Sequence, residues 1–450
     1  MKAIAPLIRK YNKPIPRYTS YPTVPFWSAT PTQEQWKAHV QEAFQHSNAS
    51  QGISLYIHLP FCESLCTYCG CNTRITVNHK VESPYIQALK KEWEMYLQLF
   101  HEKPVISELH LGGGTPTFFS PQNLEELLQF ILEKVDVAAN ASFSFEAHPA
   151  NTTYEHLESL YRLGFRRLSL GIQDFNPHIQ QLINRHQTVE QVERVMLQAR
   201  SLGYDSINFD LIYGLPDQTL NSITETIEQV IGLKPDRIAF YSYAHVPWIK
   251  PGQRKYDESN LPSGQEKFML YEQGREMLES ASYIEIGMDH FALKHDALVH
   301  SMYADVLHRN FMGYTEQHTQ LMIGLGVSSI SDTWTCFAQN EKKLEDYYKR
   351  IDANEFPIMK GHILNADDLL RRKLILDLMC KQRAAFNVEL LNNSSIALLD
   401  EMMRDNMILI IDNQLEITSV GKALLRNCCS IYDAYLDDET KTINLFSMAV

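Results

Sequence analysis

Four of the eight cysteines in this 450-residue chain stand close together. Cys62, Cys66, Cys69 and Cys71 fall within ten residues. Eight cysteines scattered at random would place about 0.2 in such a window, so the group calls for a chemical explanation. Thiolates at this spacing hold an iron–sulfur cluster, and three of them leave one iron open to a further ligand. The alternative is a structural zinc knot, although both thiolates of Cys69-Gly70-Cys71 reach one tetrahedral ion with difficulty.

Composition and the N-terminus predict a folded cytoplasmic protein. The chain is 44% hydrophobic and 21% charged, which excludes a disordered or fibrous protein. Its first apolar stretch is short, contains Pro6 and is followed at once by Arg9 and Lys10, unlike a signal peptide. No apolar run approaches the roughly 20 residues of a membrane span, so we expect no membrane partner. In a reducing cytosol, clustered cysteines are metal ligands or redox centres rather than disulfides.

Short strand patterns alternate with amphipathic helices from about residue 53 onward. Six strands with intervening helices predict a parallel sheet, because parallel strands need crossover connections. We therefore expect an α/β fold, a partial (β/α)6 TIM-like barrel, with a doubly wound sheet as the alternative. The strands are expected at 53–57, 105–111, 142–147, 167–171, 206–213 and 237–243. The helices are expected to begin at Ser83-Pro84 and Ser120-Pro121, each with serine as the N-cap, and then to span 154–163, 188–202 and 220–233.

Four segments make up the predicted domain organisation. Residues 1–50 form an N-terminal arm, 51–260 the barrel, 261–360 a barrel extension with substrate contacts, and 361–450 a mostly helical C-terminal domain. After residue 260 we expect longer helices and irregular segments, ending with a hairpin at 407–418 and a final helix at 420–436. This tail resembles a winged-helix module, but it carries 9 Lys and Arg against 13 Asp and Glu. With a net charge of −13 for the whole chain, we expect no nucleic-acid partner.

Polar residues follow several of the expected strands. The cysteine loop comes directly after the first strand, and the glycine run Gly112–Gly114 comes after the second. Glu146 ends the third strand and Asp210 the fifth, while Gln173 lies just past the fourth. Ligands of α/β folds gather at the C-terminal ends of the strands, and carboxylates there suit ribose hydroxyls or a cationic amino group. Helix capping or salt bridging is the alternative role for these carboxylates.

The pattern Cys62-x3-Cys66-x2-Cys69, with an aromatic residue at Tyr68, resembles the radical S-adenosylmethionine superfamily. In that superfamily three cysteines hold a [4Fe–4S] cluster, and S-adenosylmethionine chelates the fourth iron. Its reductive cleavage yields a 5′-deoxyadenosyl radical. Motifs along nearly the whole chain are similar to one family within it, the oxygen-independent coproporphyrinogen III oxidases (coproporphyrinogen dehydrogenases). These motifs are Pro16–Thr23, Cys69-Gly70-Cys71, Gly112–Thr117, Gly171–Phe175, Asn208–Pro216, Gly287–Ala292, His308–Phe311 and Arg426–Cys428.

The resemblance implies an oxidoreductase of haem and porphyrin biosynthesis. It would decarboxylate two propionates of coproporphyrinogen III oxidatively and without oxygen, giving the vinyl groups of protoporphyrinogen IX. Its partners would be this tetrapyrrole and an external electron donor and acceptor, and we expect a monomer. Two alternatives stay open: a haem-handling chaperone of the same superfamily, and a zinc-stabilised interaction protein.

The resemblance also implies roles for individual residues. The cluster ligands would be Cys62, Cys66 and Cys69, whereas Cys71 would be needed for catalysis without necessarily binding iron. Two S-adenosylmethionine molecules are implied, and the residues that would bind them or line their pocket are Tyr56, Tyr68, Gly113, Gly114, Thr115, Glu146, Gln173, Arg185, Asp210, Ala244 and Ile330. The candidate cations for the substrate carboxylates are Arg17, His290, His308 and Arg309.

Overall fold

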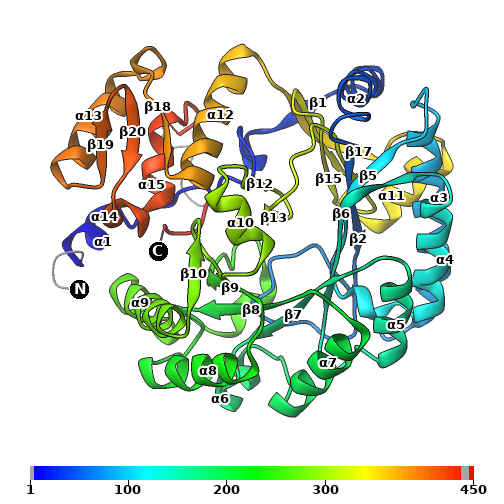
Figure 1. The fold of residues 1–450 in the computed structure, drawn as a ribbon, viewed down its shortest axis with the longest axis horizontal. Helices are drawn as coiled ribbons and strands as arrows, with labels where there is room; N and C mark the ends of the chain where they lie inside the picture. Colours follow the sequence, from blue (N-terminus) through cyan, green and yellow to red (C-terminus); the bar gives the residue numbers. More distant parts are fainter. Residues whose placement is uncertain (1–4, 437–444, 450) are drawn as a thin grey trace.

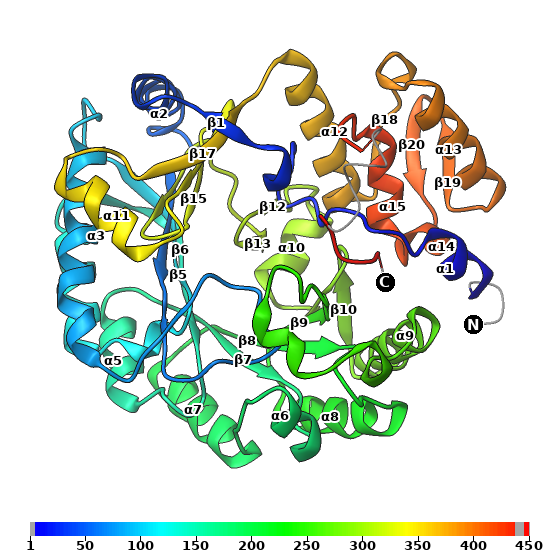
Figure 2. The same cartoon turned by 180° about the vertical axis from the view of Figure 1, so that it is seen from behind.

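A strongly curved sheet dominates the computed structural model, which describes residues 5–436 and 445–449 (Figure 1). The largest sheet in these residues has 13 strands in the order β1-β17-β16-β15-β14-β2-β5-β6-β7-β8-β9-β11-β10. Helices cover its outer face, and the cysteine loop lies at one end of its central strands. The N-terminal arm meets the last described residues through an isolated bridge between Pro14 and Met448, and α1 lies beside α14 (Figure 2).

Six central strands are parallel and adjoin in chain order. A doubly wound sheet would reverse its strand order part-way, so that alternative is wrong and the partial six-unit barrel is confirmed. The strands are β2 (Ile53–Leu59), β5 (Val105–Gly113), β6 (Asp136–Ala147), β7 (Arg167–Gln173), β8 (Ser206–Tyr213) and β9 (Arg237–Ser242). The connecting helices are α3 (Glu82–Leu97), α4 (Pro121–Leu132), α5 (Tyr154–Arg162), α6 (Pro177–Leu182), α7 (Val189–Leu202) and α8 (Leu220–Leu233).

Local sequence signals explain most of these helix ends. The Ser120 side chain accepts a hydrogen bond from the Asn123 N–H, so the predicted cap of α4 is confirmed. The predicted cap of α3 is wrong, because Ser83 lies inside the helix, which begins at Glu82. A short 3-10 turn, His79–Val81, leads directly into α3 and supplies its first turn instead. Proline is tolerated just after such a start, where its missing N–H is not needed.

The segment after residue 260 contains more strands than predicted. The expected long helices are present, as in α9 of 17 residues, but the expectation of irregular structure between them is wrong. The strands there have three to six residues, which is too short to show a clear periodic pattern. β10 and β11 continue the sheet beyond β9, and β14 pairs in parallel with β2 on the other side. The elements are α9 (Gly264–Ser280), β10 (Tyr283–Ile286), β11 (His290–Leu293), α10 (Ala297–Tyr303), β12 (His308–Asn310), β13 (Gly313–Thr315), β14 (Met322–Leu325), β15 (Ile330–Asp332), β16 (Cys336–Asn340), α11 (Leu344–Asp352) and β17 (Ile358–Ile363).

A buried ionic group occupies the N-terminal end of the barrel strands. Arg167 and Arg237 are the first residues of β7 and β9, and Glu316 follows β13. The Arg167 guanidinium lies 2.6 Å from one Glu316 oxygen, and that of Arg237 lies 3.7 Å from the other. Burial alone would raise the pKa of Glu316, but the two arginine charges lower it to about 2. Glu316 therefore ties the segment after β13 to two strands of the barrel.

The C-terminal segment packs against the N-terminal arm. The predicted hairpin is confirmed, whereas the predicted helix 420–436 is broken at Leu424, whose backbone is not helical. The break places Arg426 under the arm, where its guanidinium donates to the carbonyls of Ile15 and Pro16. The elements are α1 (Ala5–Tyr11), β1 (Ser28–Thr30), α2 (Gln33–Ser47), α12 (Ala366–Lys381), β18 (Arg383–Ala385), α13 (Asn393–Arg404), β19 (Ile408–Ile411), β20 (Gln414–Ile417), α14 (Ser419–Lys422) and α15 (Leu425–Cys429).

Candidate active site

A cavity of about 550 Å³ opens at the C-terminal ends of the central strands and continues into the barrel. Most of the cysteine loop contributes to its wall, together with the ends of β5, β6, β7 and β8. Loops at this end of parallel strands carry the ligand sites of barrel folds. The cavity therefore lies where the sequence predicts the chemistry.

The cysteine loop is closed at its base by a small pairing and by glycine. β3 (Phe61–Cys62) pairs with β4 (Arg74–Ile75), so the chain returns to its starting point after the last cysteine. Gly114, at the end of β5, lies against this base: a Cβ there would stand 2.7 Å from the backbone of Pro60. Glycine is therefore required for the close approach of β5 to the loop.

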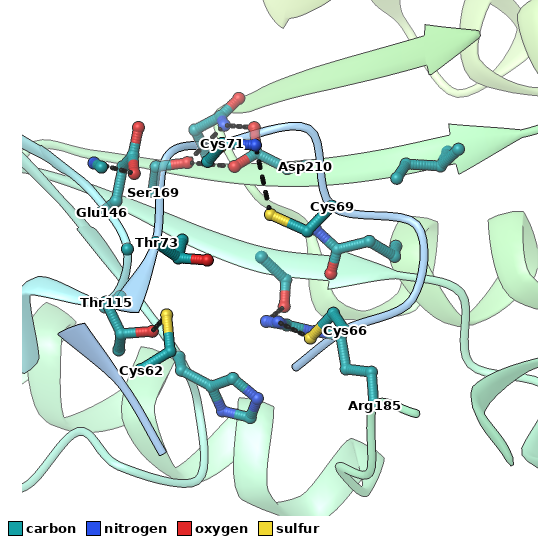
Figure 3. Close-up of a pocket in the computed structure, with 18 of the residues that line it drawn as sticks. Cys62, Cys66, Cys69, Cys71, Thr73, Thr115, Glu146, Ser169, Arg185 and Asp210 are labelled. Carbon is teal, nitrogen blue, oxygen red and sulfur yellow. Dashed lines mark hydrogen bonds between the residues drawn. The ribbon is translucent and has the colours of Figure 1, made fainter. Parts of the chain in front are cut away.

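The sulfur atoms of Cys62, Cys66 and Cys69 surround one space (Figure 3). The Cys62 sulfur lies 3.3 Å from the Thr115 hydroxyl oxygen, and the Cys66 sulfur accepts a long hydrogen bond of 3.8 Å from Arg185. The Cys69 sulfur accepts one of 3.4 Å from the Cys71 backbone N–H. Each of the three thiols is thus held by a different polar neighbour, while Cys71 is exposed.

The environment affects the three thiols differently. The Cys71 side chain also donates to the Cys69 sulfur, which lowers the pKa of the Cys69 thiol. Burial raises the pKa of Cys62 to about 11. Because iron binds thiolates, cluster binding has to displace the Cys62 proton, whereas the Cys69 thiol gives up its proton more readily.

The donor set fits a [4Fe–4S] cluster with one open iron. In a cubane each thiolate binds a different iron, so the thiolates need not converge on one ion. In the part of the chain that the structure describes, no three or more His, Cys, Asp or Glu side chains are arranged to hold a single metal ion. The three loop thiols that share one space match the cubane, in which each thiolate binds a different iron.

Two carboxylates face the cavity from neighbouring strand ends. Glu146 accepts a 3.1 Å hydrogen bond from the Gly113 N–H and lies 3.5 Å from the His110 ring. Burial alone would raise its pKa, but these neighbours lower it, so Glu146 is ionised. Asp210 accepts from Ser169 and from Asn208, both at 2.9 Å (Figure 3). Burial, with the Glu146 charge, raises the pKa of Asp210 to about 6.

Gln173 and Arg185 complete the same wall. Gln173 ends β7 with a φ of 63°, and its buried side-chain oxygen has no hydrogen-bond partner in the described residues. Such an oxygen is an acceptor awaiting a donor. Arg185 donates to the Gly171 carbonyl and, at 3.1 Å, to Gln187, so its guanidinium is fixed beside Cys66. These groups suit a ligand that carries both hydroxyl and amino donors.

Most of the predicted site residues line this one cavity, but three do not. Tyr56 lies behind Glu146, with its hydroxyl 3.0 Å from His58 and its ring stacked on His110. The Ala244 carbonyl accepts from Gln253, which also donates to the Tyr68 carbonyl. Ile330 lies on β15 and packs near Trp27 and Phe337. The residues that do line the cavity are Cys62, Cys66, Tyr68, Cys69, Cys71, Gly113, Gly114, Thr115, Glu146, Gln173, Arg185 and Asp210.

The four candidate cations for the substrate carboxylates also differ in whether they line the cavity. His290 lines the cavity, whereas Arg309 is buried beside Asp289. Arg17 donates to the Ser242 carbonyl at 2.7 Å. His308 stacks on His318, outside the cavity wall.

Sequence reasoning missed several polar residues of the wall. His110, Ser144 and Ser169 each stand two positions before a predicted site residue or motif. Alternate positions of a strand face the same side, so this period of two is the signal that would have found them.

Comparisons with known proteins agree with this arrangement. Residues 56–230 match the Radical SAM superfamily. The chain is 38% identical to the oxygen-independent coproporphyrinogen III oxidase of Synechocystis sp., over 99% of this chain and 98% of that one. It is 37% identical to the Escherichia coli protein of the same name, over 97% and 96%. The solved structure of coproporphyrinogen III oxidase from Escherichia coli, described as a radical SAM enzyme, superposes with a TM-score of 0.87 at 35% identity, covering 94% of this chain and 100% of that one.

Proposed function

Because the chain belongs to the oxygen-independent coproporphyrinogen III oxidase family, we propose that it converts two propionates of coproporphyrinogen III into vinyl groups. Each conversion removes one hydrogen atom from the propionate β-carbon, releases carbon dioxide and passes one electron to an acceptor. The observation that carries the proposal is the full-length match, with the three loop thiols gathered on one cavity. Neither a haem chaperone nor a zinc-stabilised interaction protein is favoured by that match.

The enzyme uses a [4Fe–4S] cluster and S-adenosylmethionine, as its superfamily does. When bound, this pair supplies the radical chemistry that removes a hydrogen atom from an unactivated C–H bond. We assign the cluster to Cys62, Cys66 and Cys69. The rest of the wall has to orient the reactants and exclude water.

We propose that the polar residues of the wall bind two S-adenosylmethionine molecules. Glu146, ionised beside Gly113, suits a cationic amino group, and we assign it to the first molecule with Tyr56 behind it. Asp210 and Gln173, on the neighbouring strands β8 and β7, and Arg185, in the loop between α6 and α7, are assigned to the second. Tyr68 presents a ring on which a purine can stack. Gly113, Gly114 and Thr115 border both groups, and Ala244 and Ile330 support the pocket from outside its wall.

Replacing Glu146 by glutamine is expected to weaken S-adenosylmethionine binding by about 10- to 100-fold, because a charge-assisted hydrogen bond is lost. Glutamine keeps the acceptor for the Gly113 N–H, so the fold is retained. Equilibrium binding to the anaerobically purified enzyme measures the change. Glu133→Gln, on the surface after α4, is the matched control and should leave the affinity unchanged. Equal affinities for Glu146→Gln and wild type would contradict the assignment.

Replacing Cys71 by alanine is expected to leave the iron content unchanged while product formation falls at least about tenfold. The variant loses the thiol that hydrogen-bonds the Cys69 sulfur, and such bonds help to set the reduction potential of a cluster. Iron analysis and the midpoint potential test this, and the potential should become more negative. Loss of iron would show instead that Cys71 is a ligand.

The reaction also defines the partners and the setting of the enzyme. The groups of the cavity have been assigned to the cluster, S-adenosylmethionine and the tetrapyrrole. We therefore propose that the electron donor and the electron acceptor are separate, external partners. We propose a cytoplasmic monomer without nucleic-acid partners, in keeping with the net charge of −13. None of the described helices is long and apolar enough to span a bilayer.

Anaerobic incubation with a reductant, S-adenosylmethionine and coproporphyrinogen III tests the proposed function. The expected products are protoporphyrinogen IX and two carbon dioxide molecules per tetrapyrrole. Stable haem binding without decarboxylation would favour a chaperone, and a colourless zinc-containing protein would contradict the whole proposal.

A further inference from the structure

His290 is the first residue of β11 and lines the same cavity as the cysteine loop. It pairs with Ala239 of β9, so its ring projects from the edge of the parallel sheet. Two tyrosines meet this ring edge to face, Tyr314 at 5.3 Å and Tyr241 at 5.8 Å between ring centres. Packing alone therefore restricts the orientation of the His290 ring.

A buried carboxylate fixes the proton on one ring nitrogen. The His290 Nδ1 lies 2.6 Å from an Asp289 oxygen, and Asp289 is only 4% exposed. Burial alone would raise the pKa of Asp289, but His290 and Arg309 lower it to about 2. The ionised carboxylate can only accept, so Nδ1 carries a proton and donates it. The other nitrogen, Nε2, is left for a partner on the cavity side.

Arg309 balances the charge of Asp289 from behind. Its guanidinium lies 4.0 Å from the same Asp289 oxygen and 4.5 Å from the centre of the Tyr314 ring. Arg309 is 4% exposed and does not itself line the cavity. Because Arg309 offsets the charge of Asp289, a second anion on the cavity side of the His290 ring meets less repulsion from that carboxylate.

The other buried basic side chains of the cavity are already engaged. Arg237 donates to both oxygens of Asp296, and Arg185 donates to Gly171 and Gln187. The Nε2 atom of His290 has no hydrogen-bond partner among residues 5–436 and 445–449. Facing it, Gly313 has no side chain, and a Cβ built there would stand 4.0 Å from Nε2. The Nε2 atom is thus left on the cavity side for a ligand.

We propose that His290, oriented by Asp289, binds one propionate carboxylate of the tetrapyrrole through Nε2–H. This inference rests on the proposed function and names a specificity-determining residue for it. The imidazolium then lies between two carboxylates, one from the protein and one from the substrate, and donates to each. Glu146, on the more distant β6, repels a substrate carboxylate from its own strand end. Asp210 is paired with the same residue, Ala239, as His290, so it is the nearest competing anion for that ring. His290 is therefore the group through which a propionate is held on β11 against the repulsion of these carboxylates.

Two substitutions at one position separate this role from a structural one. His290→Asn keeps an amide that can donate to Asp289 but removes the group on the cavity side. His290→Gln instead places an amide nitrogen near Nε2. The probe is coproporphyrin III, the unreactive oxidised form of the substrate, titrated by fluorescence into anaerobic holoenzyme. His308→Asn is the matched control, because His308 is packed on His318 away from the cavity.

The expected result is a loss of coproporphyrin III affinity of about 10- to 100-fold in His290→Asn, the range of one charge-assisted hydrogen bond. His290→Gln should regain part of it, and His308→Asn should match wild type. Separate titrations with S-adenosylmethionine should show equal affinities in all four proteins. Thermal unfolding verifies that each variant is folded.

Three outcomes would overturn the inference. Unchanged coproporphyrin III affinity in folded His290→Asn would exclude the contact and leave the proposed function intact. A loss confined to S-adenosylmethionine would assign His290 to the cofactor carboxylate instead. Failure of wild type itself to bind coproporphyrin III would contradict the proposed substrate, and with it this inference.

Discussion

Serine at Cys62, Cys66 or Cys69 is expected to reduce bound iron from about four atoms per chain to near zero, and to abolish product formation. Each of the three sulfurs faces the shared space of the cavity, and the remaining loop thiol, Cys71, is exposed. A serine hydroxyl is a poor substitute for thiolate because it stays protonated near neutral pH. Iron and sulfide analysis of anaerobically purified protein, with the visible absorption spectrum, measures the loss.

Cys336→Ser is the control for this series. Cys336 is a buried thiol on β16 and does not line the cavity, so this variant should keep wild-type iron and activity. Full iron content in any one of the three loop variants would show that the ligand set is wrong.

Glu316→Gln is expected to lower the free energy of unfolding by about 2–3 kcal/mol, because a charge-assisted hydrogen bond in a partly buried ion pair is lost. Arg167 would lose the partner at 2.6 Å, and the segment after β13 would lose its tie to the barrel. Urea denaturation of wild type and variant measures the difference. The matched control is Glu355→Gln, which removes an exposed pair with Arg350 at 2.7 Å and should cost less than about 1 kcal/mol.

The ion pair of Glu316 with Arg167 also predicts how the stability of the fold changes with pH. Glu316 has a pKa near 2 when folded, below the ordinary value of 4.5. A carboxylate whose pKa is lowered by folding stabilises the fold at pH values above its pKa in the unfolded chain. That contribution disappears as the pH falls from about 4.5 to 2. Wild type should therefore lose more stability than Glu316→Gln over this interval. Parallel pH profiles for the two proteins would contradict the assignment.

The barrel can be predicted from the sequence because its signals are local. Helices of 12 to 14 residues with clear caps, such as α4 and α7, begin and end within a residue or two of the positions that their caps and apolar spacing indicate. The cysteine spacing by itself indicates where the chemistry takes place. The strands β10–β17 escape prediction, since segments of three to six residues show no clear period and are defined by partners far along the chain.

The residues of the candidate site also fall into two groups, those that the sequence predicts and those that only the fold identifies. Cys62, Glu146 and Asp210 can be predicted, because they follow strands and their residue types suit the chemistry. The role of His290 cannot be chosen over that of His308 from the sequence, where both are histidines in family-like motifs. Only the fold shows that Asp289 orients one of them toward the cavity and that His318 covers the other. Long-range packing, rather than local pattern, decides between such candidates.

Transfer of a labelled hydrogen atom tests the proposed reaction most directly. Coproporphyrinogen III deuterated at the propionate β-carbons would be incubated anaerobically with the reduced holoenzyme and S-adenosylmethionine. The prediction is 5′-deoxyadenosine that carries one deuterium atom, formed together with the vinyl product. Unlabelled 5′-deoxyadenosine, with the propionates intact, would contradict the assignment of this cavity to coproporphyrinogen III.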